Sequence, residues 1–120
     1  MRKPPAQRAL SPLHRFKAEF FKALGHPVRL AILDALREGE KSVNQLVEEL
    51  ELEQPSVSQQ LSVLRQRGFL QARKEGTSVY YRTTDPTVYA FLDLGRAIFE
   101  RQLKTQSDLL SELQEGSPQP

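Results

Sequence analysis

The sequence of 120 residues predicts a mainly α-helical fold with one small β-hairpin. Three observations support this fold class. Apolar residues recur at spacings of three and four through most of the chain, which is typical of amphipathic helices. Glycine and proline fall between these segments, where helices end and begin. Only residues 69–83 favour strands, because β-branched and aromatic residues follow a turn that contains Gly76.

Two helices are expected between residues 12 and 39. The first begins near Pro12 and ends at Gly25, because glycine is typical of helix C-terminal caps. Pro27 then starts the second, since the missing N–H of proline costs little in a first turn. One apolar stripe of the first helix consists of Leu13, Phe16, Phe20 and Leu24.

Two shorter helices follow and form a helix-turn-helix. Ser42 and Gln45 have the spacing of a capping box, so a third helix is expected from there to about Glu51. Pro55 falls in the first turn of a fourth helix, which Gly68 terminates. Because only a few residues separate these two helices, they match the helix-turn-helix motif.

The hairpin completes the predicted domain. Its strands are expected at Phe69–Lys74 and Ser78–Thr83. A hairpin directly after a helix-turn-helix is a wing, so the fold class is a winged helix-turn-helix, in one domain of residues 12–114. Residues 1–11, which are basic and rich in proline, and residues 115–120 are expected to be flexible tails.

The last helix is long for a domain of this size. It is expected from Pro86 to about residue 113, and at roughly 1.5 Å per residue it would extend about 40 Å. Its apolar stripe and that of the first helix would be partly exposed in a monomer, so a two-fold dimer through these helices is expected. Folding of the last helix over its own core is the alternative. The interface is assigned to Leu13, Phe16, Phe20, Phe91, Leu94, Ile98 and Phe99.

The fourth helix carries the main functional signal. Val57, Leu61 and Leu64 form its buried stripe, which leaves an arc of short uncharged side chains facing outward. Serine and glutamine can approach base edges and phosphates closely and hydrogen-bond to either, so the arc favours DNA recognition over an ordinary solvated surface. The arc consists of Ser56, Ser58, Gln59, Gln60, Ser62 and Gln66.

Charge is arranged in blocks, although the formal net charge is only +2. Residues 1–37 carry eight positive and two negative side chains, and residues 38–53 carry one and six. Residues 54–83, the fourth helix and the hairpin, carry five and one, whereas residues 84–120 carry three and six. A polyanion such as double-stranded DNA would therefore be attracted to residues 54–83.

Other functional classes lack the residues that they require. The chain has no cysteine, which excludes disulfides, thiolate metal sites and thiol redox chemistry. No apolar run approaches the roughly 20 residues of a membrane span, and the N-terminus lacks a signal-peptide core, so a soluble cytoplasmic protein is expected. His14 and His26 are too far apart to share a metal within one chain, and His26 is better explained by the helix junction. No histidine accompanies the hydroxyl residues of the polar arc, so no enzyme, cofactor or metal site is expected.

The order of these motifs resembles that of the ArsR/SmtB family of bacterial winged-helix repressors. The resemblance covers roughly residues 13–105 and lies in the strings FKALGHPVRLAILDALREGE, SVNQLVEEL, QPSVSQQLSVLRQRGFL and ARKEGTSVYYR. It implies a homodimeric, sequence-specific repressor with an inverted-repeat operator. In that family the first and last helices form the dimer, the fourth helix enters the major groove and the wing lies beside the backbone or minor groove.

The resemblance also implies which side chains contact DNA. Those on the fourth helix that would face bases or phosphates are Gln54, Ser56, Ser58, Gln59 and Gln60. Those that would hold the DNA backbone are Arg65 and the wing residues Arg73, Lys74, Thr77 and Arg82. Ser58 is the weakest base-reader of the set, because a serine near a helix start can instead bond to the backbone.

The sensor sites of well-known family members do not match this chain. Many members have a cysteine pair at the start of the third helix, where Ser42 and Asn44 stand here. Persulfide-sensing members need cysteines. A site of other members on the last helix, Asp-x-His with a later His and Glu, corresponds to Asp93, Gly95, Gln106 and Leu109. Three alternatives stay open: a small-molecule sensor, a metal sensor with ligands from two chains, and a winged helix that binds a protein instead of DNA.

Overall fold

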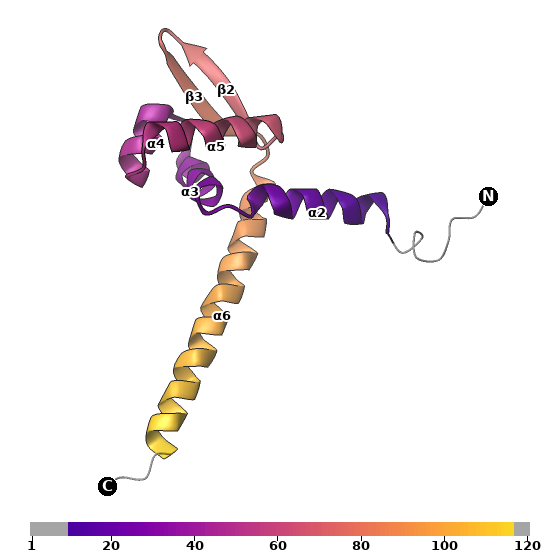
Figure 1. Ribbon diagram of the computed structural model, residues 1–120, viewed down its shortest axis with the longest axis vertical. Coiled ribbons are helices and arrows are strands. Elements are labelled where there is room, and N and C mark those ends of the chain that lie inside the picture. The colour runs from indigo at the N-terminus through magenta and orange to yellow at the C-terminus, as the bar shows by residue number, and fades with distance from the viewer. Residues whose placement is uncertain (1–9, 117–120) are drawn as a thin grey trace, which may run out of the picture. The chain divides into compact units, whose positions relative to one another are not determined.

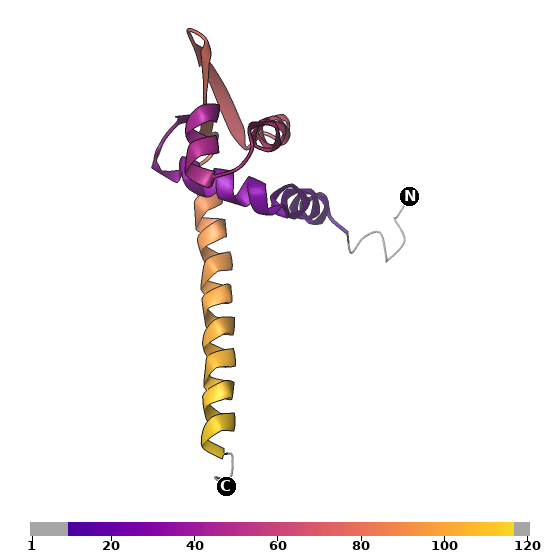
Figure 2. The ribbon, with the colours of Figure 1, turned by 60° about the vertical axis from the view of Figure 1, so that its left-hand side comes forward.

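The computed structural model describes residues 10–116 and divides the chain into two compact units, residues 1–85 and 86–120 (Figures 1 and 2). Most of the two tails expected at residues 1–11 and 115–120 lies outside the described residues. The second unit is helix α6 (Thr87–Gly116). The first unit contains α2 (Pro12–Leu24), α3 (Pro27–Ala35), the 3-10 turn η1 (Leu36–Glu38), β1 (Lys41–Ser42), α4 (Val43–Leu50), α5 (Gln54–Gln66), β2 (Leu70–Glu75) and β3 (Ser78–Thr83).

Side-chain caps start α3 and α4 where the sequence predicts these helices. The Ser42 hydroxyl accepts a hydrogen bond from the Gln45 N–H at 3.2 Å, and Gln45 Oε1 accepts one from the Ser42 N–H at 2.8 Å. This reciprocal pair is the expected capping box of α4. His26 Nδ1 accepts from the Val28 N–H at 3.2 Å and caps α3, which agrees with a structural role at the junction.

The end of α5 depends on a glycine. Gly68 has a φ of 85°, a left-handed conformation that a Cβ atom disfavours. Its N–H donates to the Arg65 carbonyl at 3.0 Å, and the Phe69 N–H donates to the Leu64 carbonyl at 2.9 Å. These two bonds form a Schellman motif. The chain therefore leaves α5 in a fixed direction, toward β2.

The core of the first unit lies among α3, α4 and α5. Both α3 and α4 pack against α5, as the views in Figures 1 and 2 show. The helices bury one stripe of α5 and so determine which of its faces points outward. The fully buried side chains are Ile32, Leu33, Leu46, Val57, Leu61 and Leu64.

The sheet has three strands in the order β1-β3-β2, one more than the expected hairpin. β2 and β3 pair antiparallel from Leu70 opposite Thr83 to Glu75 opposite Ser78. The two-residue strand β1 pairs antiparallel with the other edge of β3, where Lys41 lies opposite Tyr81. Two residues are too few to produce an alternating pattern, so β1 is not visible in the sequence alone.

Three elements have boundaries that differ from the expected ones. α3 ends at Ala35, and the residues before Gly39 form η1, in which the Gly39 N–H donates to the Leu36 carbonyl at 3.1 Å. β2 begins at Leu70 and continues to Glu75, one residue later than predicted at each end. α6 continues to Gly116 because the residues after position 113 include good helix formers such as glutamine and glutamate.

Helix α6 has 30 residues and an apolar stripe that is largely exposed. Its exposed apolar residues recur at helical spacing and are Phe91, Leu94, Ile98, Phe99, Leu103, Leu109, Leu110 and Leu113. Within residues 10–116, no helix combines the length and the apolar character needed to cross a lipid bilayer.

Candidate nucleic-acid interface

The outward side of α5 presents short, uncharged side chains. Gln54 and Gln59 are exposed, and Ser56 and Ser58 are half-buried. We call these four residues the polar face of α5. All four lie in the first half of the helix, the part that enters a groove when a recognition helix binds DNA.

Gln60 does not lie on the exposed arc, contrary to the prediction. It is 8% exposed, and its Oε1 accepts a hydrogen bond from Arg29 Nε at 2.8 Å. The reason is its position, three residues after Val57 and four before Leu64, which places it on the buried side of α5. The spacing of Gln60 from Val57 and Leu64 therefore indicated burial, whereas its polar side chain suggested exposure.

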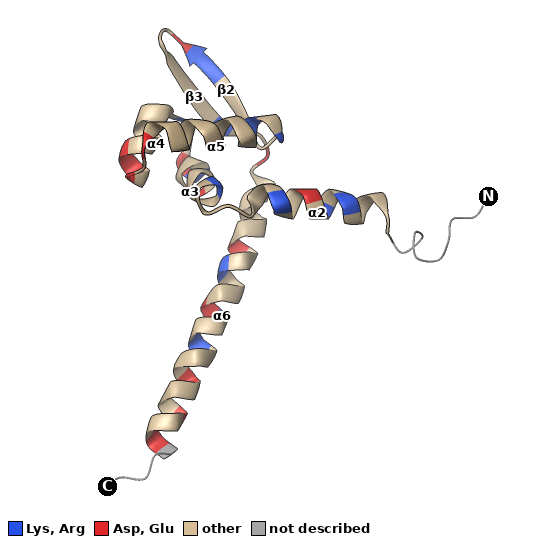
Figure 3. Cartoon of the chain, viewed as in Figure 1, with Lys and Arg blue, Asp and Glu red and all other residues tan. Residues whose placement is uncertain are grey.

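The wing supplies cations next to α5. β2 contacts α5 and carries Arg73 and Lys74, and β3 carries Arg82. The uncharged residue Thr77 lies in the turn between the two strands. All four of these side chains are exposed, and Arg82 Nη2 donates to Gln71 Oε1 at 2.6 Å. Figure 3 shows the basic colour along β2.

Arg73 is the most constrained cation of the wing. Its Nη2 pairs with Glu40 Oε1 at 2.5 Å, and its Nη1 pairs with Glu75 Oε2 at 2.7 Å. Its guanidinium also lies 5.0 Å from the centre of the Tyr80 ring. The hydrogen bond from Arg73 lowers the pKa of Glu40, and the bonds to Glu40 and Glu75 raise the pKa of Arg73. The pair is therefore ionised at neutral pH.

Other cations on α5 and the wing form fewer ionic contacts than Arg73. Among the described residues, Arg65, Lys74 and Arg82 form no salt bridge, and Arg65 is exposed in the last turn of α5. Acidic residues gather instead on α4, where Glu48 and Glu49 are exposed (Figure 3). This distribution would attract an anion to α5 and the wing and repel it from α4.

The start of α4 does not offer the ligands of the cysteine-pair metal site that the sequence resemblance brings into question. The Ser42 hydroxyl serves as the N-cap of α4, and Asn44 beside it is exposed. In the part of the chain that the structure covers, no group of three or more His, Asp or Glu side chains could hold a metal ion.

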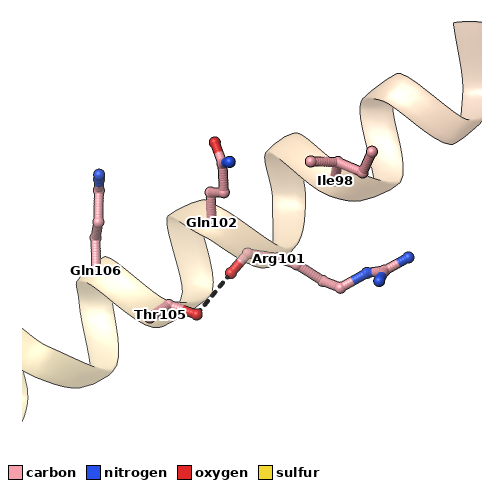
Figure 4. A pocket seen from close by; sticks show the side chains of 5 residues that line it. All are labelled: Ile98, Arg101, Gln102, Thr105 and Gln106. Carbon is pink, nitrogen blue, oxygen red and sulfur yellow. Dashed lines mark hydrogen bonds between the residues drawn. The ribbon is translucent and has the colours of Figure 1, made fainter. Parts of the chain in front are cut away.

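Helix α6 has a shallow hollow on its surface. Its lining residues all come from one helix, and Thr105 Oγ1 donates to the Arg101 carbonyl at 3.0 Å (Figure 4). A hollow bounded by a single helix encloses nothing, so it is a groove between side chains and not a ligand cavity. The lining residues are Ile98, Arg101, Gln102, Thr105 and Gln106.

The residues assigned to a dimer interface are mostly exposed. Phe20 is the exception, because it is half-buried and its ring centre lies 5.3 Å from that of Phe69. The exposed members are Leu13, Phe16, Phe91, Leu94, Ile98 and Phe99.

Comparison with known proteins identifies close similarity to bacterial regulators. Residues 26–72, from the cap of α3 into β2, match the family described as bacterial regulatory protein, arsR family. The chain is 39% identical over 106 residues to the HTH-type transcriptional regulator Rv0081 of Mycobacterium tuberculosis, covering 88% of this chain and 93% of that protein. It is 38% identical over 87 residues to the biofilm growth-associated repressor of Xylella fastidiosa, covering 72% and 76%.

Solved structures show the same similarity. The crystal structure of Rv0081 matches with a TM-score of 0.71 and 38% identity, over 82% of this chain and 99% of that chain. A homodimeric winged helix-turn-helix DNA-binding domain of Mycobacterium bovis matches with a TM-score of 0.68 and 29% identity, over 86% and 93%.

Proposed function

This chain belongs to the ArsR family of bacterial transcriptional regulators, and we propose that it is a homodimeric repressor that binds an inverted-repeat operator in double-stranded DNA. Members of this family regulate transcription and are not enzymes. We place its action in the cytoplasm, where a bacterial regulator meets its DNA.

The polar face of α5 beside a basic wing is the observation that carries the DNA-binding proposal. A glutamine amide can form two hydrogen bonds with adenine, so Gln54 and Gln59 are proposed to read bases, with Ser56 and Ser58 on bases or phosphates. Cations position a protein on the duplex without reading its sequence. The proposed backbone contacts are Arg65, Arg73, Lys74, Thr77 and Arg82.

Exposed apolar side chains support the dimer. Soluble monomers rarely expose large contiguous apolar patches, yet both α2 and α6 expose aromatic and aliphatic residues at helical spacing. The similar domain of M. bovis is described as homodimeric. The proposed interface comprises Leu13, Phe16, Phe20, Phe91, Leu94, Ile98 and Phe99.

Two-fold symmetry would determine the form of the operator. In a symmetric dimer the two α5 helices are related by the same rotation that relates the halves of an inverted repeat. Half-sites are then expected about one helical turn, roughly 34–36 Å, apart. Occupation of such a site within a promoter would block transcription.

Regulation is proposed to act through the spacing of the two reading helices. A ligand bound between the dimer-forming helices would change that spacing and weaken operator binding by about 1–3 kcal/mol. Titration of the protein and labelled operator with a metabolite panel tests this proposal. Operator affinity that stays constant across the panel would indicate a repressor controlled by its own expression level.

The decisive experiment is a measurement of affinity for labelled DNA from upstream of the chain's own gene, across a salt series and against a scrambled duplex. Binding that resists the competitor and falls steeply with salt is expected, because base contacts and phosphate contacts both contribute. Equal, weak affinity for both duplexes would contradict self-regulation, and genome-wide selection of bound fragments would then search for another operator.

A pair of variants separates DNA recognition from a protein-binding role. Gln59→Ala combined with Arg73→Ala should abolish specific DNA binding and leave the dimer intact. The matched control is Gln114→Ala combined with Arg96→Ala on α6, which removes the same residue types outside the proposed DNA interface. Unchanged DNA binding in the first variant would favour a winged helix that binds a protein partner through its acidic α4 or through α6.

A further inference from the structure

One half-buried arginine connects three helices of the first unit. Arg29, on α3, donates from Nη1 to the Ala23 carbonyl in the last turn of α2 at 2.9 Å. It also donates from Nε to Gln60 Oε1 on α5 at 2.8 Å. Both acceptors belong to residues that are at most 8% exposed, so water has little access to replace either bond.

The chemistry of this contact requires a guanidinium. α2 ends at Leu24, so the Ala23 carbonyl has no partner within its own helix. A cation near a helix C-terminus is also favoured by the helix dipole. Only arginine offers several donors in one rigid plane, which lets it hold two acceptors in a fixed relation. Among the described residues Arg29 forms no salt bridge, so neutral oxygens bind its charge.

A second link between α2 and the end of α5 lies on the surface. Arg67 Nη1 pairs with Glu19 Oε2 at 3.1 Å, and the two side chains are 45% and 62% exposed. An exposed ion pair competes with water and contributes little. The link through Arg29, whose two acceptor residues are buried, is therefore the one that can restrain α5.

We propose that Arg29 and Gln60 form a positioning pair that fixes the rotation of α5 relative to α2. Gln60 directly follows Gln59, so the bond that holds Gln60 inward also determines where Gln59 points. The inference rests on the proposed function, in which α2 takes part in the dimer and Gln59 reads DNA. The pair then transmits the geometry of the dimer to the polar face of α5 without contacting DNA.

Arg29→Met, Gln60→Met and the double variant test the pair. Methionine keeps the length of the side chain and removes its polar groups. Each single variant should weaken operator binding about tenfold, and the double variant should be no weaker than either single, because all three remove the same link. The salt dependence should not change, because no phosphate contact is lost. Circular dichroism and sedimentation confirm that each variant is folded and dimeric at the assay temperature.

Controls separate positioning from stability. Glu19→Gln breaks the surface link without removing a cation, and its operator affinity should stay within about twofold of the wild type. If Arg29→Met does not fold, Arg29→Lys retains the charge but not the planar fork, and it should also lose affinity.

Two results would overturn the positioning role. One is unchanged operator affinity in folded Arg29 and Gln60 variants. The other is a Gln60→Met variant that alters preference at one base pair and adds to the effect of Arg29→Met, which would make Gln60 a base contact. Wild-type protein that binds no DNA specifically, at its own promoter or among selected fragments, would instead reject the proposed function, and the inference with it.

Discussion

Helices α5 and α6 carry the same kind of apolar stripe but differ in its exposure. Val57, Leu61 and Leu64 on α5 are 0% exposed, because α3 and α4 of the same chain cover them. On α6, by contrast, Leu94 is 63% and Ile98 54% exposed. An amphipathic pattern thus shows that a helix needs a partner, but it does not show whether that partner belongs to the same chain.

The outer faces of the two helices differ as well. The polar face of α5 is uncharged, whereas the outer face of α6 carries charges such as the Arg96–Glu100 pair, joined at 3.0 Å. Charged residues at a spacing of four are typical of a solvated helix surface. These differences support the proposal that the outer face of α5 recognises DNA and that the Phe91–Phe99 part of the α6 stripe forms the dimer.

The largest effect is expected from the buried stripe. Leu61→Ala should lower the free energy of unfolding by about 2–5 kcal/mol, because it removes buried methyl groups and leaves a cavity. Urea denaturation measures this change. The control is Leu110→Ala on α6, an exposed side chain that is not among the proposed interface residues and should contribute less than about 1 kcal/mol. Similar losses of unfolding free energy at both positions would contradict the difference in burial between the stripes of α5 and α6.

The next effect concerns association. Ile98→Glu should weaken the dimer about a hundredfold, because a carboxylate would enter an apolar interface. Sedimentation equilibrium measures the association constant. Ser107→Glu adds the same charge to another exposed position of α6 and should leave association nearly unchanged. If Ile98→Glu left the association constant unchanged, the stripe of α6 would not be part of the dimer interface.

A smaller effect sharpens the contrast between the outer faces. Gln59→Ala should reduce operator affinity about tenfold, since a paired glutamine–adenine contact is worth about 1–3 kcal/mol. Gln114→Ala on α6 should leave it unchanged. Fluorescence anisotropy with labelled operator measures both variants, and equal affinities for the two would show that the polar face of α5 does not read bases.

The smallest effect compares two exposed ion pairs. Glu40→Gln should raise affinity for any duplex about two- to threefold, because it removes a carboxylate that competes with phosphate for Arg73. Glu100→Gln, which breaks the pair on α6, should have no effect. Anisotropy with operator and scrambled DNA distinguishes this general gain from a sequence-specific one.

The Glu40–Arg73 pair also makes a prediction about pH. Because Arg73 lowers the pKa of Glu40, the pair stabilises the fold above the ordinary glutamate pKa of about 4.3 and loses this contribution as the pH falls through the lowered value. The thermal midpoint of the wild type should therefore converge on that of Glu40→Gln in acid. A constant difference between the two midpoints from pH 6 to pH 3, roughly the range of glutamate titration, would contradict this assignment.

Local signals explain which elements the sequence could predict. The capping box at Ser42, the prolines of the first turns and the glycine after α5 act within a few residues, so α2, α4 and α5 lie close to where they were expected. The wing followed from a turn glycine between two short β-favouring segments.

Long-range contacts explain what the sequence could not predict. β1 depends on β3, whose residue Tyr80 lies opposite Ser42 although 38 positions separate them. Arg29 and Gln60 are 31 positions apart, so no local pattern pairs them. The DNA and dimer contacts of individual side chains stay predictions, which the variants above test.

Strand β1 gives the wing and the helix-turn-helix a shared residue. Ser42 pairs with Tyr80 of the wing and at the same time caps the first turn of α4. Opening of the wing would therefore also disturb the start of α4. In native-state hydrogen exchange, we expect the amide protons of β3 and of the first turn of α4 to become accessible together, as one cooperative unit.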